Sequence, residues 1–142
     1  MNQIEDYIIV KNTIPKDLCK IMIDECNKKE WRKHTWNNYT TGENSSEATK
    51  ELDVMNCTKQ QQDRMTPSLG RALDEYQKIV SWEGDKTGGQ WLSKFSPIRF
   101  NKYEVGTMMR KHYDHIHSIF DGKMKGVPLV SIVGNLNEDY EG

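Results

Sequence analysis

The sequence lacks any stretch that could cross a membrane and any leader-like start. Its longest apolar runs fall far short of the ~20 residues that span a bilayer. Residues 1–7 include Glu5 and Asp6, with no basic start followed by an apolar run, which is not the pattern of a signal peptide. We therefore expect a protein without membrane contact, located in the cytoplasm.

Cysteine is scarce, and its spacing excludes two further classes of protein. The three cysteines are Cys19, Cys26 and Cys57, an odd count that contains no C-x-x-C pair. This pattern argues against a disulfide framework and against a zinc knuckle. It favours a reducing compartment.

Net charge is also nearly absent: 20 basic residues face 21 acidic ones, for a formal charge of -1. Such a balance gives no overall attraction to nucleic acid or to an anionic membrane, so neither is expected as a partner. A local basic group remains, which either forms a solvated face or binds an anionic ligand. It consists of Lys102, Arg110, Lys111, Lys123 and Lys125.

Large apolar side chains are present in sufficient number for a core, with four tryptophans, six tyrosines and three phenylalanines. A chain of 142 residues suits one domain, so residues 1–142 are treated as a single unit. Two regions differ in character. Residues 1–97 are mostly helical support with a long polar loop, and residues 98–142 are rich in strand patterns.

Apolar periodicity predicts two helices. The first spans Pro15–Asn27, with a buried face of Leu18, Ile21, Met22 and Cys26. The second starts at Thr66-Pro67, where threonine can cap and proline fits the first turn. Its predicted buried stripe consists of Leu69, Ala72, Leu73, Tyr76 and Val80. The polar stretch 37–62 between the helices is interpreted as a long surface loop with a short strand near Leu52–Met55.

Strand patterns lie at both ends of the chain. Tyr7–Val10 is a short β-branched run, and three later candidates are Ile98–Tyr103, Met108–His115 and Pro128–Leu136. The last is apolar on both faces, as expected of a strand covered on both sides. Helices followed by strands indicate an α+β class, with helices packed against an antiparallel sheet or barrel.

One short segment carries chemistry. His112 and Asp114 form an H-x-D pair, and in an extended chain their side chains project from one face with Cα atoms about 6.6 Å apart. An imidazole nitrogen and a carboxylate oxygen can then reach one metal ion. They would supply two members of the two-histidine, one-carboxylate triad that holds non-haem iron. Taken alone, such a pair is more often two polar residues of a surface strand.

The residues around this pair favour the metal interpretation. Tyr103, Gly106, His112 and Asp114 follow the pattern Y-x-x-G-x(5)-H-x-D. Further along, residues 136–142 are similar to L-N-x-x-[YFW]-x-G-G. Both segments resemble the prolyl 4-hydroxylase-like branch of the iron(II)- and 2-oxoglutarate-dependent dioxygenases. The likeness covers most of the chain, tightly from Ile98 to Gly142, and is nearest to the small hydroxylases of bacteria and their viruses.

The resemblance implies a double-stranded β-helix (jelly-roll) core with N-terminal helices packed on the sheet. It implies Fe(II) bound by His112 and Asp114, with 2-oxoglutarate as co-substrate and ascorbate as a reductant. It places Tyr103 and Asn135 beside the co-substrate and Gly106 in a turn that needs a permissive backbone. The implied substrate is a prolyl residue of a peptide or protein. A core tyrosine remains the alternative for Tyr103.

Two departures from the family pattern affect this interpretation. Asn135 stands where the family normally has tyrosine, and the smaller asparagine side chain would widen the pocket. The family's distal histidine, and the arginine or lysine that binds the far carboxylate of 2-oxoglutarate, are not found after Asp114. The histidines that do follow, His115 and His117, are interpreted as non-ligands, and His34 as a packing or surface residue.

These departures lead to expectations about the whole protein. We expect this chain to be the N-terminal portion of the fold, with an incomplete core, inactive alone and completed by a longer chain or by a partner. A homodimer remains open. The alternative function is a non-catalytic binding or structural module that keeps the β-helix frame.

Overall fold

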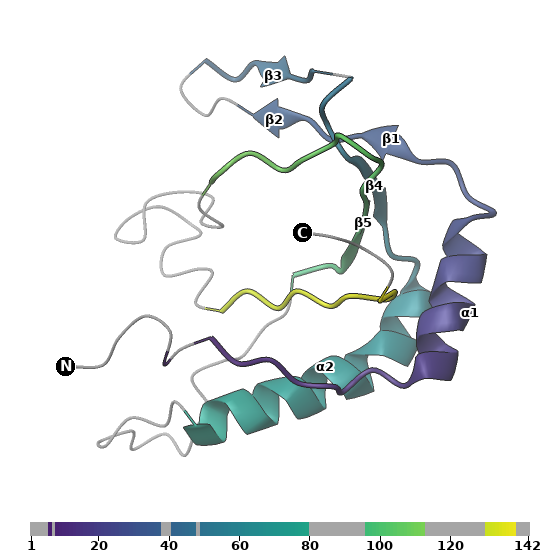
Figure 1. Cartoon of the computed structure of the whole chain (residues 1–142), viewed down its shortest axis with the longest axis vertical. Helices are drawn as coiled ribbons and strands as arrows, with labels where there is room; N and C mark the ends of the chain where they lie inside the picture. Colours follow the sequence, from purple (N-terminus) through teal and green to yellow (C-terminus); the bar gives the residue numbers. More distant parts are fainter. Residues whose placement is uncertain are drawn as a thin grey trace.

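The computed structural model describes residue 6 and residues 8–37, 41–47, 49–79, 96–112 and 130–138. Within these ranges the chain is mixed helix and sheet (Figure 1). Its elements are α1 (Lys16–Cys26), β1 (Arg32–Lys33), β2 (Trp36–Asn37), β3 (Asn44–Ser45), β4 (Asp53–Asn56), α2 (Lys59–Ile79) and β5 (Arg99–Lys102). The prediction that helices combine with an antiparallel sheet is thereby confirmed.

Helix α1 agrees with the sequence prediction to within one residue at each end. Pro15 occupies the N-cap position, and Asn27 follows the last turn. The buried face of α1 contains fewer residues than the apolar spacing predicted. Met22 is completely buried and Cys26 nearly so, whereas Ile21 is 44% exposed, so its assignment to the buried face was wrong.

Helix α2 begins at Lys59, seven residues before the predicted start at Thr66-Pro67, which was wrong. The reason is a capping box: Gln61 N donates to Thr58 Oγ1 at 3.2 Å, and Thr58 N donates to Gln61 Oε1 at 3.0 Å. These reciprocal bonds satisfy backbone donors that the first turn leaves unpaired. Pro67 therefore lies inside the helix.

The predicted loop 37–62 is also partly replaced by regular structure. Besides the start of α2, it contains β3, which pairs antiparallel with β2. It also contains β4, close to the short strand predicted at Leu52–Met55. Strand β4 is the centre of an antiparallel sheet in the order β1-β4-β5.

The core lies between this sheet and the two helices. Met55 of β4 and Phe100 of β5 are cross-strand partners and contribute to one buried cluster with Met22, Cys26 and Met65. The cluster joins α1, α2 and the sheet, and Figure 1 shows both helices along the outer side of the molecule. Burial of these side chains supplies the main stabilisation of the fold.

Three predicted strands are not strands in the residues that the structure describes. Residues 8–10, 108–112 and 130–136 have no strand pairing there. Val10 is 89% exposed and Val133 is 87% exposed, so the prediction that the last segment is covered on both faces was wrong. Apolar β-branched runs form strands only where a partner accepts their backbone bonds. The strand predicted at Ile98–Tyr103, in contrast, is confirmed as β5.

Residues 130–138 pack beside the N-terminal segment instead. Lys16 Nζ lies 3.2 Å from Glu138 Oε1, and a Cβ on Gly134 would lie 3.1 Å from Ile14 Cδ1. Leu136 packs against the core cluster. Figure 1 shows the two segments side by side above α2. This segment thus closes one side of the core without joining the sheet.

Across the described ranges, no helix is both long enough and apolar enough to span a bilayer.

Candidate functional site

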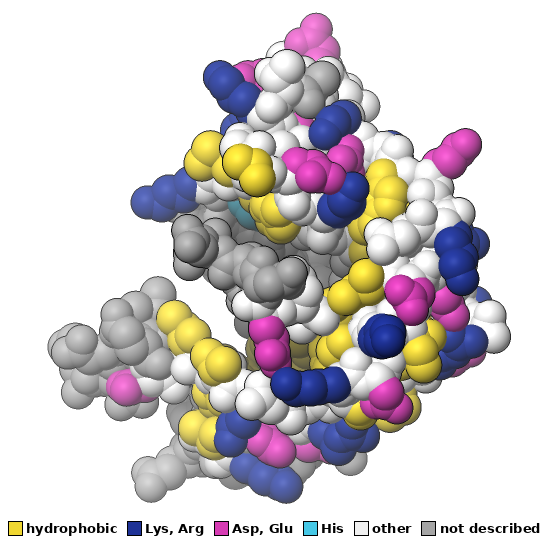
Figure 2. Space-filling view, turned by 45° about the vertical axis from the view of Figure 1, so that its right-hand side comes forward, with side chains coloured by type: hydrophobic (Ala, Val, Ile, Leu, Met, Phe, Trp, Pro, Cys, Tyr) yellow, Lys and Arg dark blue, Asp and Glu magenta, His cyan; other side chains and the backbone are white. Residues whose placement is uncertain are grey.

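The face of the sheet turned away from the helices carries polar groups. Met55 and Phe100 point toward the helices, so Val54, adjacent to Met55, points to the opposite face. Val54 is paired with Arg32 of β1, and His34, two residues after Arg32, continues on that same face. The surface turned toward the viewer in Figure 2 is hollowed, with a histidine side chain visible at the wall of the hollow.

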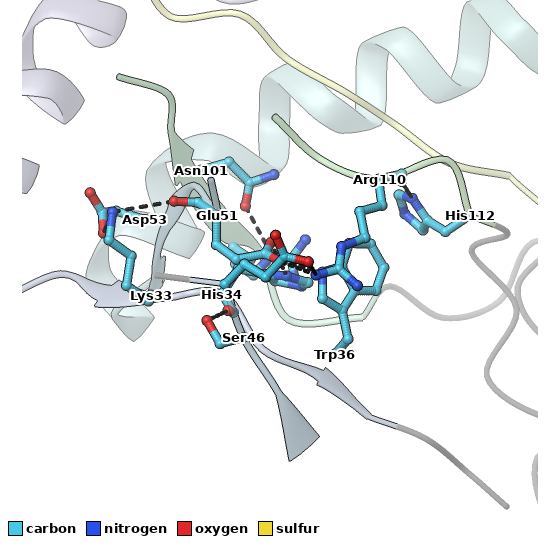
Figure 3. A network of polar contacts seen from close by, with 11 residues as sticks. Lys33, His34, Trp36, Ser46, Glu51, Asp53, Asn101, Arg110 and His112 are labelled. Carbon is cyan, nitrogen blue, oxygen red and sulfur yellow. Dashed lines mark hydrogen bonds and ion pairs between the residues drawn. The ribbon is translucent and has the colours of Figure 1, made fainter. Parts of the chain in front are cut away.

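A buried carboxylate is the centre of this polar region. The side chain of Glu51, two residues before β4, is only 2% exposed. Its Oε1 accepts a hydrogen bond from Trp36 Nε1 at 2.9 Å and lies 3.1 Å from Arg110 Nη2 (Figure 3). Both contacts offset the cost of removing a carboxylate from water. We refer to His34, Trp36, Glu51, Arg110 and His112 as the Glu51 cluster.

His34 is the second buried polar residue of the cluster, with 8% of its surface exposed. Its Nδ1 lies 3.6 Å from Glu51 Oε2, beyond ordinary hydrogen-bond length, and neither atom has a hydrogen-bond partner among the described residues. Burial, with help from the charge of Arg99, lowers the pKa of His34, and Glu51 partly opposes this shift. Of the two interpretations from the sequence, a packing or a surface residue, the burial of His34 favours the first, with its ring 4.6 Å from the Trp36 ring.

Arg110 ties the segment before His112 to residues 47–51. Besides contacting Glu51, its Nη2 lies 3.0 Å from Glu47 Oε1, and Met108 N donates to Lys50 O at 3.0 Å. The hydrogen bond from Lys50, together with the positive charges of Lys50 and Arg110, lowers the pKa of Glu47. The segment carrying His112 is thus held by the backbone hydrogen bond of Met108 and by two carboxylates that contact Arg110, the buried Glu51 and the exposed Glu47.

His112 is held from two sides. Its Nδ1 lies 2.7 Å from Arg110 O, and its ring meets the Trp36 ring edge-on at 5.3 Å between centroids. A carbonyl oxygen can only accept, so Nδ1 carries the hydrogen in this contact. In the neutral ring Nε2 then carries the lone pair, which is the form that binds a metal.

The other predicted site residues are dispersed. Tyr103 follows β5 directly and is 54% exposed, while Asn135 is an exposed residue of the 130–138 segment. Gly106 has φ +82°, which agrees with the prediction of a permissive turn. Asp114, His115 and His117 lie outside the described residues, as do Lys123, Lys125 and Val80. Within the described ranges, no three His, Cys, Asp or Glu side chains are arranged to hold a metal ion.

Sequence reasoning missed Glu51 and Trp36. The only signal was the alternation of charged and apolar residues in Glu51-Leu52-Asp53-Val54, next to a predicted strand. That pattern does not distinguish a buried carboxylate from an exposed one. Asp53 keeps 18% of its side chain exposed and pairs with Lys33 at 3.0 Å.

A scan against models of protein families, a search of curated proteins and a search of solved structures each found no match to this chain.

Proposed function

We propose that the complete protein is an Fe(II)- and 2-oxoglutarate-dependent dioxygenase that hydroxylates a prolyl residue in a peptide or protein. The proposal combines the resemblance of the sequence around His112 with one structural observation, the contact between His112 Nδ1 and Arg110 O at 2.7 Å. Metal-binding histidines characteristically donate their second ring N–H to a carbonyl or carboxylate. The same arrangement supports His112 as a ligand through Nε2.

The donor types fit ferrous iron. His112 would supply an imidazole nitrogen, and Asp114, assigned from the sequence pattern, a carboxylate oxygen. Among the described residues, Glu47 and Glu51 are carboxylates that also lie nearby, and each contacts Arg110 through its Oε1. When bound, Fe(II) and 2-oxoglutarate would activate dioxygen: one oxygen atom would enter succinate as 2-oxoglutarate loses carbon dioxide, and the other would hydroxylate a C–H bond. Ascorbate would keep the iron in the ferrous state.

The remaining parts of the site follow from the resemblance. Tyr103 would hold 2-oxoglutarate through its hydroxyl, and Asn135 would contribute an amide at the position usually taken by tyrosine. The three-stranded sheet would belong to a jelly-roll core in the complete protein.

Cobalt titration tests the metal site directly. Co(II) has visible absorption bands that report coordination, so the purified chain is titrated alongside His112→Ala and Asp114→Ala. Loss of either ligand should weaken Co(II) binding by more than about 100-fold, since outer-shell partners alone account for roughly 10–100-fold. His117→Ala is the matched control and should change binding less than about twofold. Equal binding by the wild type and His112→Ala would contradict the proposal.

The exposure of Tyr103 and Asn135 also favours a second candidate, a non-catalytic binding module that retains the frame without iron. Release of succinate from 2-oxoglutarate by the native full-length protein separates the two functions. The dioxygenase requires succinate release that depends on Fe(II) and on His112. Absence of succinate release from the native full-length protein supplied with Fe(II) would support the binding module.

A further inference from the structure

One oxygen atom links two of the groups that contact His112. Glu51 Oε1 accepts the Trp36 Nε1 hydrogen at 2.9 Å and pairs with Arg110 Nη2 at 3.1 Å. Trp36 in turn meets the His112 ring edge-on, and the Arg110 carbonyl contacts His112 Nδ1. Figure 3 shows these side chains converging from separate parts of the chain. Displacement of Glu51 would therefore loosen these two contacts of His112 at once.

We propose that Glu51 is a positioning residue that fixes the orientation and tautomer of His112. The effect of Glu51 on metal affinity rests on the proposed function. Its effect on the orientation and tautomer of the His112 ring does not. The burial of Glu51 supports this role, because water cannot replace its contacts and a low local dielectric strengthens them. Its backbone is held as well, since Lys33 Nζ donates to Glu51 O at 3.2 Å.

Glu47 provides the matched comparison within the same cluster. Its Oε1 lies 3.0 Å from the same Arg110 Nη2, almost the distance found for Glu51. It differs in three respects: its side chain is 51% exposed, it also pairs with Lys50, and the Trp36 indole donates to Glu51 and not to Glu47. Water can compensate for the loss of an exposed carboxylate, so removal of the Glu47 charge should leave Arg110 in place.

Glu51→Gln and Glu47→Gln form the decisive pair of variants. Glutamine keeps an oxygen for Trp36 but removes the charge that holds Arg110. Nitrogen NMR of histidine-labelled protein reports the tautomer of His112 without any metal. We expect the wild type and Glu47→Gln to hold hydrogen on Nδ1, and Glu51→Gln to show a mixture of tautomers.

Cobalt titration of the same proteins measures the consequence. Glu51→Gln should weaken Co(II) binding about 10-fold, as outer-shell substitutions do, and Glu47→Gln less than about twofold. Circular dichroism checks that each variant folds. If Glu51→Gln does not fold, Trp36→Phe replaces it, because it removes the indole N–H while keeping a ring against His112.

The two possible failures are distinguishable. An unchanged His112 tautomer in a folded Glu51→Gln protein overturns the positioning role, even where the wild type binds Co(II). An equal change of tautomer in Glu47→Gln also overturns it, because the effect would then follow the loss of either carboxylate beside Arg110 and not the loss of Glu51 in particular. A wild type that binds no Co(II) refutes the metal site, while the NMR comparison still decides the role of Glu51.

Discussion

Trp36 and Trp31 offer a matched measurement of what the buried carboxylate contributes. Each indole donates one hydrogen bond from a partly buried ring: Trp36 Nε1 to Glu51 Oε1 at 2.9 Å, and Trp31 Nε1 to Cys26 O at 3.2 Å. Bonds to charged groups contribute about 1.5–3 kcal/mol, and bonds between neutral groups about 0.5–1.5 kcal/mol. Both Trp→Phe substitutions lose similar ring area. Trp36→Phe should therefore lower the free energy of unfolding by about 1 kcal/mol more than Trp31→Phe.

Urea denaturation followed by circular dichroism measures this difference. The dependence of the unfolding free energy on urea should be the same in both variants, so that the midpoints compare stability alone. In a Glu51→Gln background the excess cost of Trp36→Phe should shrink, because the acceptor is then neutral. Equal costs for the two tryptophans, or a larger cost at Trp31, would refute the reasoning.

Three further predictions follow from the fold and its electrostatics. Met22→Ala, at a fully buried site, should cost about 2–5 kcal/mol of unfolding free energy, and Ile21→Ala, at a 44% exposed one, less than about 1 kcal/mol. Similar costs in urea denaturation would contradict the buried face of α1. Thr58→Ala should cost about 0.5–2 kcal/mol by removing the cap of α2, whereas Thr66→Ala, inside the helix, should not destabilise; thermal unfolding compares them. Because burial lowers the pKa of His34, the unfolded state takes up protons first, and stability should fall as pH drops below about 6.5. His34→Gln should flatten this decline, and an unchanged slope of unfolding free energy against pH would exclude His34 as its source.

Local patterns allowed part of this fold to be predicted. The apolar spacing of residues 15–27 places α1 within a residue at each end, and the strand at Ile98–Tyr103 was located correctly. The start of α2 was also present in the sequence, as Thr58 and Gln61 at capping-box spacing. It was missed because Thr66-Pro67 offers a second plausible start, and only the contacts made by residues 59–65 decide between them.

The sequence by itself determined the bounds of the first helix, the strand at Ile98–Tyr103 and the H-x-D spacing of His112 and Asp114. Only the tertiary structure decided that Glu51 is buried, that Trp36 and Arg110 share its oxygen, and that both contact His112. The physical reason is that helix periodicity is a property of neighbours three and four residues apart. The burial of a carboxylate depends instead on which distant segments enclose it, and those contacts form only when the sheet and its connecting segments assemble.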